Sequence, residues 1–194
     1  MENETIKKLK EIKPYEWWID SDDVEKILTT KNAIPNIKLF LKDSSASNHL
    51  KFLVAEILFS NDKTFPNQNE AHTVAKIYSQ ELKEAKIGNC WGVPGSESGW
   101  SSGPIKNFAK IAKNAIPELK SLLSDERVLM YIGSEEATVG NGFHIRVKDV
   151  AAYLLASCLG VEFKTNPKYR EQPNDEWKVR DKQIEKIKLQ LKSL

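Results

Sequence analysis

The chain contains three histidines and two cysteines, the residue types that bind transition metals or activate nucleophiles: His49, His72, His144, Cys90 and Cys158. No two of them stand at the short spacing of a zinc site, such as two cysteines separated by two residues. Cys158 falls on an apolar helical stripe and is expected to be a small core residue. We therefore expect no metal and no other cofactor.

Cys90 and His144 each lie in a glycine-rich loop, so a catalytic thiol–imidazole pair is one hypothesis. Glu135, in the same loop as His144, would supply a carboxylate, and the protein would be a small hydrolase or a nucleotide-handling enzyme. The Gly-Ser-Glu-Ser-Gly run at 95–99 is not Gly-x-Ser-x-Gly, and no strand precedes it as a nucleophile elbow requires. The same loop lacks the Gly-Lys-Ser/Thr closure of a phosphate loop.

Protein binding is the stronger prediction. Residues 88–104 break every helical period, yet they contain Trp91, Glu97 and Trp100. Loops of this length in compact domains usually have a function. Tryptophan dominates binding hot spots because a rigid ring gains much contact for little loss of entropy. The alternative is that both rings hold the loop against its own core, as in an Ω-loop.

A second glycine-rich loop, residues 133–145, carries adjacent carboxylates that would either bind a basic partner or remain in water. We expect both loops to lie on one edge of the molecule, because each connects helices of similar length. The predicted partner-binding residues are Trp91, Glu97, Trp100, Glu135, Glu136, Asn141 and His144.

The composition is that of a globular protein with an even charge balance. The chain has 194 residues, 29 of them basic and 27 acidic, and its net charge is +2. Lysines and glutamates are interleaved rather than gathered in a basic stripe, which argues against a nucleic-acid-binding module that uses the basic tail. The absence of long apolar runs and the two cysteines predict a cytoplasmic protein.

Helical spacing of apolar residues dominates the chain and predicts an all-α protein of seven or eight helices in a single domain, residues 1–194. The segment 128–132 is the only strand candidate, and it is short. The expected helices cover residues 22–28, 34–41, 48–60, 68–87, 105–112, 116–123, 147–159 and 176–192.

The helix over 147–159 has the clearest pattern, and Gly160 is expected to end it. Arg146 and Asp149 stand three residues apart at its start, a spacing that predicts an internal ion pair. Trp177 is expected to anchor the last helix through one apolar face.

Two stretches resemble helical-repeat proteins of the HEAT and armadillo type. Ala-Ile-Pro-Glu-Leu-Lys-Ser-Leu-Leu-Ser-Asp, residues 115–125, is similar to a first repeat helix with its early proline and acidic turn. Arg-Val-Lys-Asp-Val-Ala-Ala-Tyr-Leu-Leu, residues 146–155, resembles a second repeat helix, whose arginine tends to brace the neighbouring turn. The connection over 125–145 is much longer than a HEAT turn. The resemblance implies an irregular α-solenoid of antiparallel helix pairs.

That resemblance also implies a protein partner, because stacked helix pairs present a face and their loops to macromolecules and seldom carry catalysis. Small bacterial helical proteins of this kind resemble immunity proteins of contact-dependent growth inhibition. The expected function is therefore that of a non-catalytic cytoplasmic protein that binds a secreted toxin domain in a 1:1 complex and neutralises it.

Overall fold

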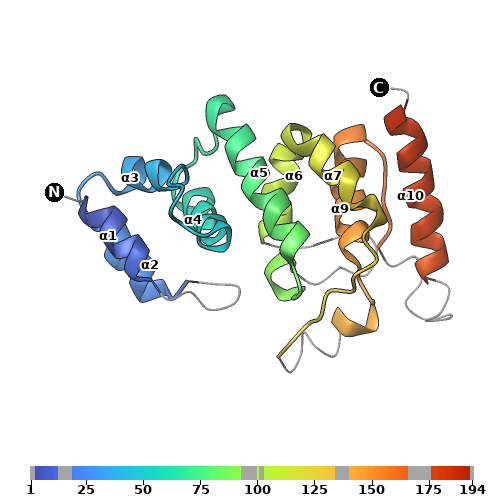
Figure 1. Cartoon of the computed structure of the whole chain (residues 1–194), viewed down its shortest axis with the longest axis horizontal. Helices are drawn as coiled ribbons and strands as arrows, with labels where there is room; N and C mark the ends of the chain where they lie inside the picture. The colour runs from blue at the N-terminus through green and yellow to red at the C-terminus, as the bar shows by residue number, and fades with distance from the viewer. Residues whose placement is uncertain are drawn as a thin grey trace. The chain divides into compact units, whose positions relative to one another are not determined.

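The structure, a computed structural model of the chain, describes residues 3–12, 19–92, 100, 103–133, 140–165 and 176–192 (Figure 1). Within these residues it is all-helical and contains no regular strand, which confirms the predicted all-α class. The chain divides into two compact units, residues 1–81 and 82–194. That the two units form one domain stays a prediction.

The helices follow the predicted ones closely, and the described residues contain one more than expected. The first unit holds α1 (Glu4–Glu11), α2 (Ser21–Leu28), α3 (Ala33–Phe40), α4 (Asn48–Asn61) and most of α5 (Gln68–Glu84). The second holds η1 (Asn89–Trp91), α6 (Pro104–Ile111), η2 (Ala112–Ala115), α7 (Ile116–Ser121), η3 (Leu122–Ser124), α9 (Val147–Leu159) and α10 (Glu176–Lys192). None of the helices in the described part of the chain combines the length and apolar character needed to cross a membrane.

Helix α1 is the helix that the apolar spacing of the sequence does not predict. The Asn3 side chain accepts a hydrogen bond from the Thr5 backbone N–H at 2.9 Å, which caps the first turn. Leu9 is fully buried, and Lys8 pairs with Glu4 one turn away at 3.3 Å. The segment is mostly charged and so shows no clear apolar period. Its N-cap and its single buried face nevertheless specify a helix.

The first unit has an aromatic core between α4 and α5. Phe52 and Phe59 of α4 pack edge-on against Tyr78 of α5, with ring centroids 4.9 and 6.1 Å apart. Phe65, in the connection, packs edge-on against Phe59 at 5.0 Å. The Tyr78 hydroxyl donates a hydrogen bond to Glu56, so its polar end is satisfied. Helix α4 is therefore deeply buried in the first unit.

Helix α9 forms the core of the second unit. It contacts α6, α7, η2, η3 and α10. Val150, Leu154 and Leu155 are fully buried, and Gly160 adopts a left-handed conformation (φ 67°) that ends the helix as predicted. The two stretches that resemble HEAT helices, α7 and α9, are therefore in direct contact.

The strand candidate 128–132 lies in an extended segment that makes isolated bridges. Met130 pairs in parallel with Ile87, and Val128 pairs antiparallel with Arg146. The Leu129 N–H donates to the Ile145 carbonyl at 2.8 Å. Because residues 86–88 take part in this pairing, α5 ends at Glu84 rather than continuing to residue 87 as predicted.

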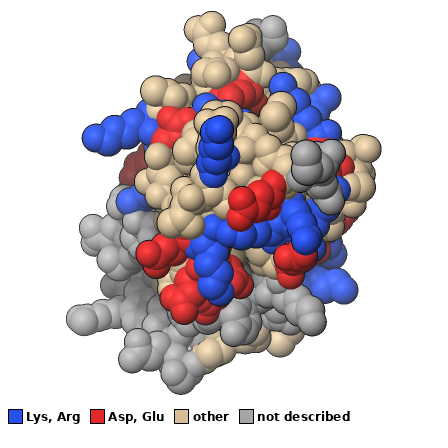
Figure 2. All heavy atoms as spheres, turned by 90° about the vertical axis from the view of Figure 1, so that its left-hand side faces the viewer, with Lys and Arg blue, Asp and Glu red and all other residues tan. Residues whose placement is uncertain are grey.

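Ion pairs on the first unit join helices as well as residues of one helix. On the face that Figure 2 shows, Lys and Arg side chains lie interspersed with Asp and Glu side chains. Lys38 of α3 contacts Asp62, which follows α4, at 2.7 Å and Glu70 of α5 at 3.4 Å. Asp62 also accepts hydrogen bonds from the Thr64 backbone N–H and hydroxyl. The hydrogen bond from Lys38 and those from Thr64 lower the pKa of Asp62 to about 2.

We predict that Asp62→Asn lowers the free energy of unfolding by about 1 kcal/mol at pH 7, because the pair with Lys38 is only partly shielded from solvent. The lowered pKa stabilises the fold above pH 3.8, the ordinary value, and that contribution disappears as the pH falls toward 2. Urea unfolding at several pH values measures the difference. Asp23→Asn, which breaks the exposed pair with Lys26, should change stability far less; an equal effect would contradict the prediction.

Candidate functional site

The two loop tryptophans lie inside the second unit. Trp91 is fully buried and Trp100 is 3% exposed. The Trp91 ring packs against Phe108 of α6 at 6.4 Å, and the Trp100 ring packs against Tyr153 of α9 at 5.0 Å. In this conformation neither ring offers surface to a partner. The sequence left two interpretations open, and the geometry favours the one in which the tryptophans anchor the loop to its own core.

The described ends of the two loops meet at Tyr131, in keeping with the expectation that the loops lie together. A Cβ atom on Gly88 would lie 2.4 Å from the Tyr131 ring, and one on Gly140 would lie 2.2 Å from it. Both glycines therefore pack directly against the ring, where no side chain has room. The Tyr131 hydroxyl donates to the Gly92 carbonyl at 3.1 Å.

Two asparagine side chains hold the backbone on either side of this contact. The Asn141 amide donates to the Tyr131 carbonyl at 2.8 Å and accepts from its N–H at 2.9 Å. Asn89 makes the same pair of bonds with Ile132, at 2.8 and 2.9 Å. Asn141, a predicted partner-binding residue, thus holds the Tyr131 backbone in place. Glu97, Glu135 and Glu136 lie outside the described residues.

The described residues of the catalytic hypothesis, Cys90 and His144, each contact other residues. Cys90 is buried, and its thiol donates to the Ile87 carbonyl at 3.4 Å. His144 is exposed, and its ring packs edge-on with that of Trp177, with the ring centroids 5.9 Å apart. Glu135 lies outside the described residues. No group of histidine, cysteine and carboxylate residues in the described ranges is arranged to hold a metal ion.

A buried ionic network lies at the start of α9. The Asp149 carboxylate accepts hydrogen bonds from the Arg146 guanidinium at 2.8 and 3.0 Å and from the Arg146 backbone N–H at 2.9 Å. The predicted ion pair is therefore confirmed, and the same carboxylate caps the helix. Arg180 of α10 approaches Asp149 at 3.3 Å. All three side chains are almost completely buried.

Arg180 connects this network to the backbone of two neighbouring segments. Its guanidinium donates to the carbonyls of Phe143 at 3.0 Å, His144 at 3.2 Å and Thr165 at 3.1 Å. His144 has a positive φ of 46°, a conformation uncommon outside glycine. The buried arginine thus fixes the turn that directs the His144 ring outward, toward Trp177.

The outer side of the network carries carboxylates. Arg146 and Lys148 both contact Glu126, at 3.1 and 2.5 Å, and both contact Asp181, at 2.8 and 2.9 Å. The Glu126 and Asp181 side chains are 66% and 45% exposed, whereas those of the two cations are 2% and 8% exposed. The charged groups that face solvent here are therefore acidic.

Both carboxylates stay ionised to low pH. The hydrogen bond from Lys148 lowers the pKa of Glu126 below its ordinary value. Burial acts to raise the pKa of Asp181, but hydrogen bonds from Arg146 and Lys148 outweigh it and lower that pKa as well. Both groups therefore remain carboxylates at neutral pH and form the exposed ends of the network, with their charge balanced by the buried Arg146 and Lys148.

Large apolar side chains are exposed on the two segments that carry these carboxylates. Trp177 of α10 is 38% exposed, and its ring lies 5.2 Å from the Arg146 guanidinium. Val128 pairs across the bridge with Arg146, so both side chains lie on one face of the extended segment. Met130, which is 62% exposed, lies two residues further on the same face and pairs with Ile87.

We call this surface the Trp177 surface, and it comprises Ile87, Glu126, Val128, Met130, His144, Trp177 and Asp181. Of the predicted partner-binding residues that the structure describes, His144 lies on it. The sequence pattern predicts that Trp177 anchors the last helix, and its contact with Arg146 agrees with that prediction. The alternation of Val128 and Met130 with buried Leu129 and Tyr131 was the available signal for an exposed apolar face.

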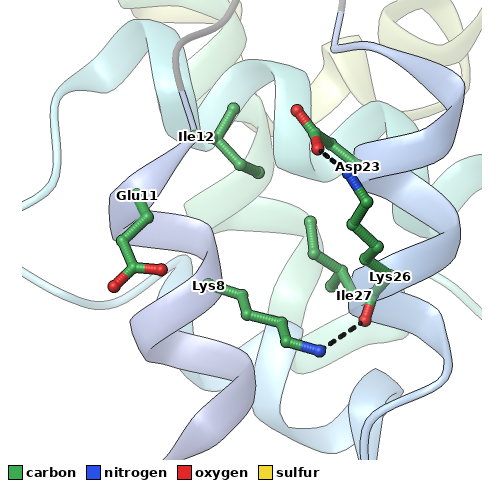
Figure 3. Close-up of a pocket in the computed structure, with 6 residues that line it drawn as sticks. All are labelled: Lys8, Glu11, Ile12, Asp23, Lys26 and Ile27. Carbon is green, nitrogen blue, oxygen red and sulfur yellow. Dashed lines mark hydrogen bonds and ion pairs between the residues drawn. The ribbon is translucent and has the colours of Figure 1, made fainter.

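A hollow of about 230 Å³ lies between α1 and α2 (Figure 3). Lys8 and Lys26 reach its rim, and Ile27 lies at its buried side. Lys8 donates to the Lys26 carbonyl at 3.1 Å, and Lys26 pairs with Asp23 at 2.9 Å, as the dashed lines show. Because both lysines are already paired within the chain, the hollow is a weaker candidate than the Trp177 surface.

Comparisons with known proteins identify no family for this chain: no family model matches it, and no curated protein or solved structure is significantly similar to it.

We predict that Asp149→Asn lowers the free energy of unfolding by about 3–5 kcal/mol, because two buried guanidinium groups lose their shared counter-charge. Urea unfolding followed by circular dichroism measures the loss. Glu185→Gln is the matched control, since Glu185 makes an exposed pair with Lys188 on α10 at 2.7 Å and should contribute below 1 kcal/mol. Similar losses in the two variants would contradict the prediction.

A second pair of variants tests the packing around Tyr131. Gly140→Ala should lower stability by about 1–3 kcal/mol, because the new methyl group collides with the Tyr131 ring and forces it to move. Gly142→Ala should be tolerated, since nothing lies within 4 Å of the corresponding Cβ position. Thermal unfolding of both variants measures the difference, and equal melting temperatures would refute this packing.

Proposed function

We propose that this chain is a non-catalytic protein-binding domain whose interface is centred on Trp177. The observation that carries the proposal is an exposed indole held in place by contacts with Arg146 and His144. Tryptophan and arginine are enriched in binding hot spots because they bury a large area at low entropic cost. A ring that is already ordered before binding loses still less entropy on association.

The surroundings of Trp177 match the anatomy of a protein interface. Val128 and Met130 add exposed apolar area, and Glu126 and Asp181 add a polar rim. Interfaces of this kind combine an apolar centre with polar groups that exclude water at the edge. Leu189, also on α10, is exposed without belonging to this surface.

We propose further that the helices form an irregular α-solenoid of HEAT-like pairs. The contact between α7 and α9 supports this, because these are the two helices that resemble the first and second helices of a repeat. The position of Arg146 supports it too, since its guanidinium reaches Glu126 in the preceding turn as the repeat arginine tends to do. Helix-repeat proteins act by binding other macromolecules.

The proposed partner is a secreted toxin domain, which the chain binds 1:1 in the cytoplasm and neutralises, as an immunity protein of contact-dependent growth inhibition does. This step rests on the resemblance stated from the sequence. The mixed charge of the chain also suits a tight, specific contact rather than general attraction to polyanions.

Co-expression with proteins encoded beside the gene tests the proposal. We expect one of them to be toxic alone and harmless with this chain, and the two to form a 1:1 complex. Trp177→Ala should weaken the complex by about 30-fold or more, equivalent to about 2 kcal/mol, and abolish protection. Calorimetry and a growth assay measure these effects.

Leu189→Ala is the matched control, because it removes an exposed apolar side chain from the same helix outside the Trp177 surface. It should leave affinity and protection unchanged, with circular dichroism confirming that both variants fold. Full protection by a folded Trp177→Ala variant would contradict an interface centred on Trp177.

A further inference from the structure

We propose that the Trp177 surface selects a partner segment that places a lysine or arginine beside apolar side chains. This inference rests on the proposed function and specifies the chemistry of the partner at that surface. It follows from the asymmetry of the ionic network, in which Arg146 and Lys148 are buried while Glu126 and Asp181 face solvent.

The exposed carboxylates retain capacity for further hydrogen bonds. At Asp181, Oδ1 accepts from Arg146 and Lys148 at 2.8 and 2.9 Å, whereas the contact of Oδ2 with Arg146 is long, at 3.5 Å. At Glu126, each oxygen accepts one bond, from Lys148 or Arg146. An ionised carboxylate offers about four lone-pair sites. Both groups can therefore accept further hydrogen bonds from a cationic group of a partner.

Their arrangement also favours a cation over a neutral donor. The buried cations hold both carboxylates in fixed positions, so binding costs little further ordering. Hydrogen bonds between an ammonium or guanidinium and a carboxylate are about twice as strong as neutral ones. Trp177 lies one helical turn from Asp181, and Val128 lies two residues from Glu126 along the extended segment, so the stem of a partner lysine or arginine and its apolar neighbours would find exposed apolar surface.

Among the residues that the structure describes, the basic neighbours in sequence belong to other faces. Trp177 and Asp181 are one helical turn apart on α10, whereas Lys178 and Lys182 lie about 100° further round the helix. Arg127 alternates with Glu126 and Val128 along the extended segment, and its guanidinium bonds Asp125 and the Lys83 carbonyl. These cations therefore do not cover the acidic pair.

Peptide binding to the intact protein tests the inference. The probes are a short acetylated peptide of lysine and leucine and a counterpart with glutamate in place of every lysine. The readout is the indole N–H resonance of Trp177, assigned by its loss in Trp177→Phe. We expect the lysine peptide to shift this resonance and to bind at least about tenfold more tightly than the glutamate peptide, with a preference that weakens as salt is added.

Variants then test whether Glu126 and Asp181 are the carboxylates that bind the lysine peptide. The double variant Glu126→Gln with Asp181→Asn should lower affinity for the lysine peptide about tenfold, whereas Glu185→Gln, an exposed carboxylate elsewhere on α10, should not. Equal binding of the two peptides to the unmodified protein would overturn the inference without relying on any variant. A lysine peptide that leaves the Trp177 resonance unmoved would overturn it too.

The outcomes separate this inference from the proposed function. If protection in the co-expression assay depends on Trp177 but the peptides show no charge preference, the interface stands and the basic partner is wrong. If the lysine peptide binds at Trp177 while Trp177→Ala still protects fully, the surface has the inferred chemistry and the neutralisation proposed for it is wrong.

Discussion

The second unit depends on one buried carboxylate. Asp149 is surrounded by the guanidinium groups of Arg146 and Arg180, and none of the three side chains has access to water that would compensate a missing partner. A charge buried in this way is tolerated only when its counter-charge and hydrogen bonds are in place. The network therefore fixes α10 against α9 in a single arrangement, which apolar packing alone would leave less specific.

The position of the candidate site follows from that arrangement. Arg180 holds the carbonyls of the turn at Phe143 and His144, which sets the direction of the His144 ring. Arg146 lies over the Trp177 ring on one side and anchors exposed carboxylates on the other. The surface is thus rigid because its supports are buried, and rigidity is what allows a few side chains to supply much of the binding energy.

The described parts of the two glycine-rich loops pack inside the second unit. Trp91 and Trp100 fill space inside the second unit, and Tyr131 packs directly against Gly88 and Gly140. Glycine in these loops thus serves close packing at two points. The loop residues then act on the site indirectly, since they hold the extended segment from which Val128 and Met130 project.

Local sequence patterns predict most of the helices, the end of α9 at Gly160 and the ion pair of Arg146 with Asp149. These depend on contacts within about one helical turn, so residue spacing carries the information. Even α1 had its local signals in Asn3 and Leu9. The burial of Trp91, the exposure of Trp177 and the contacts of Arg146 with Glu126 and Asp181 become visible in the folded chain alone. Such contacts join residues tens of positions apart, and a side chain's burial depends on which elements pack around it, which no local pattern encodes.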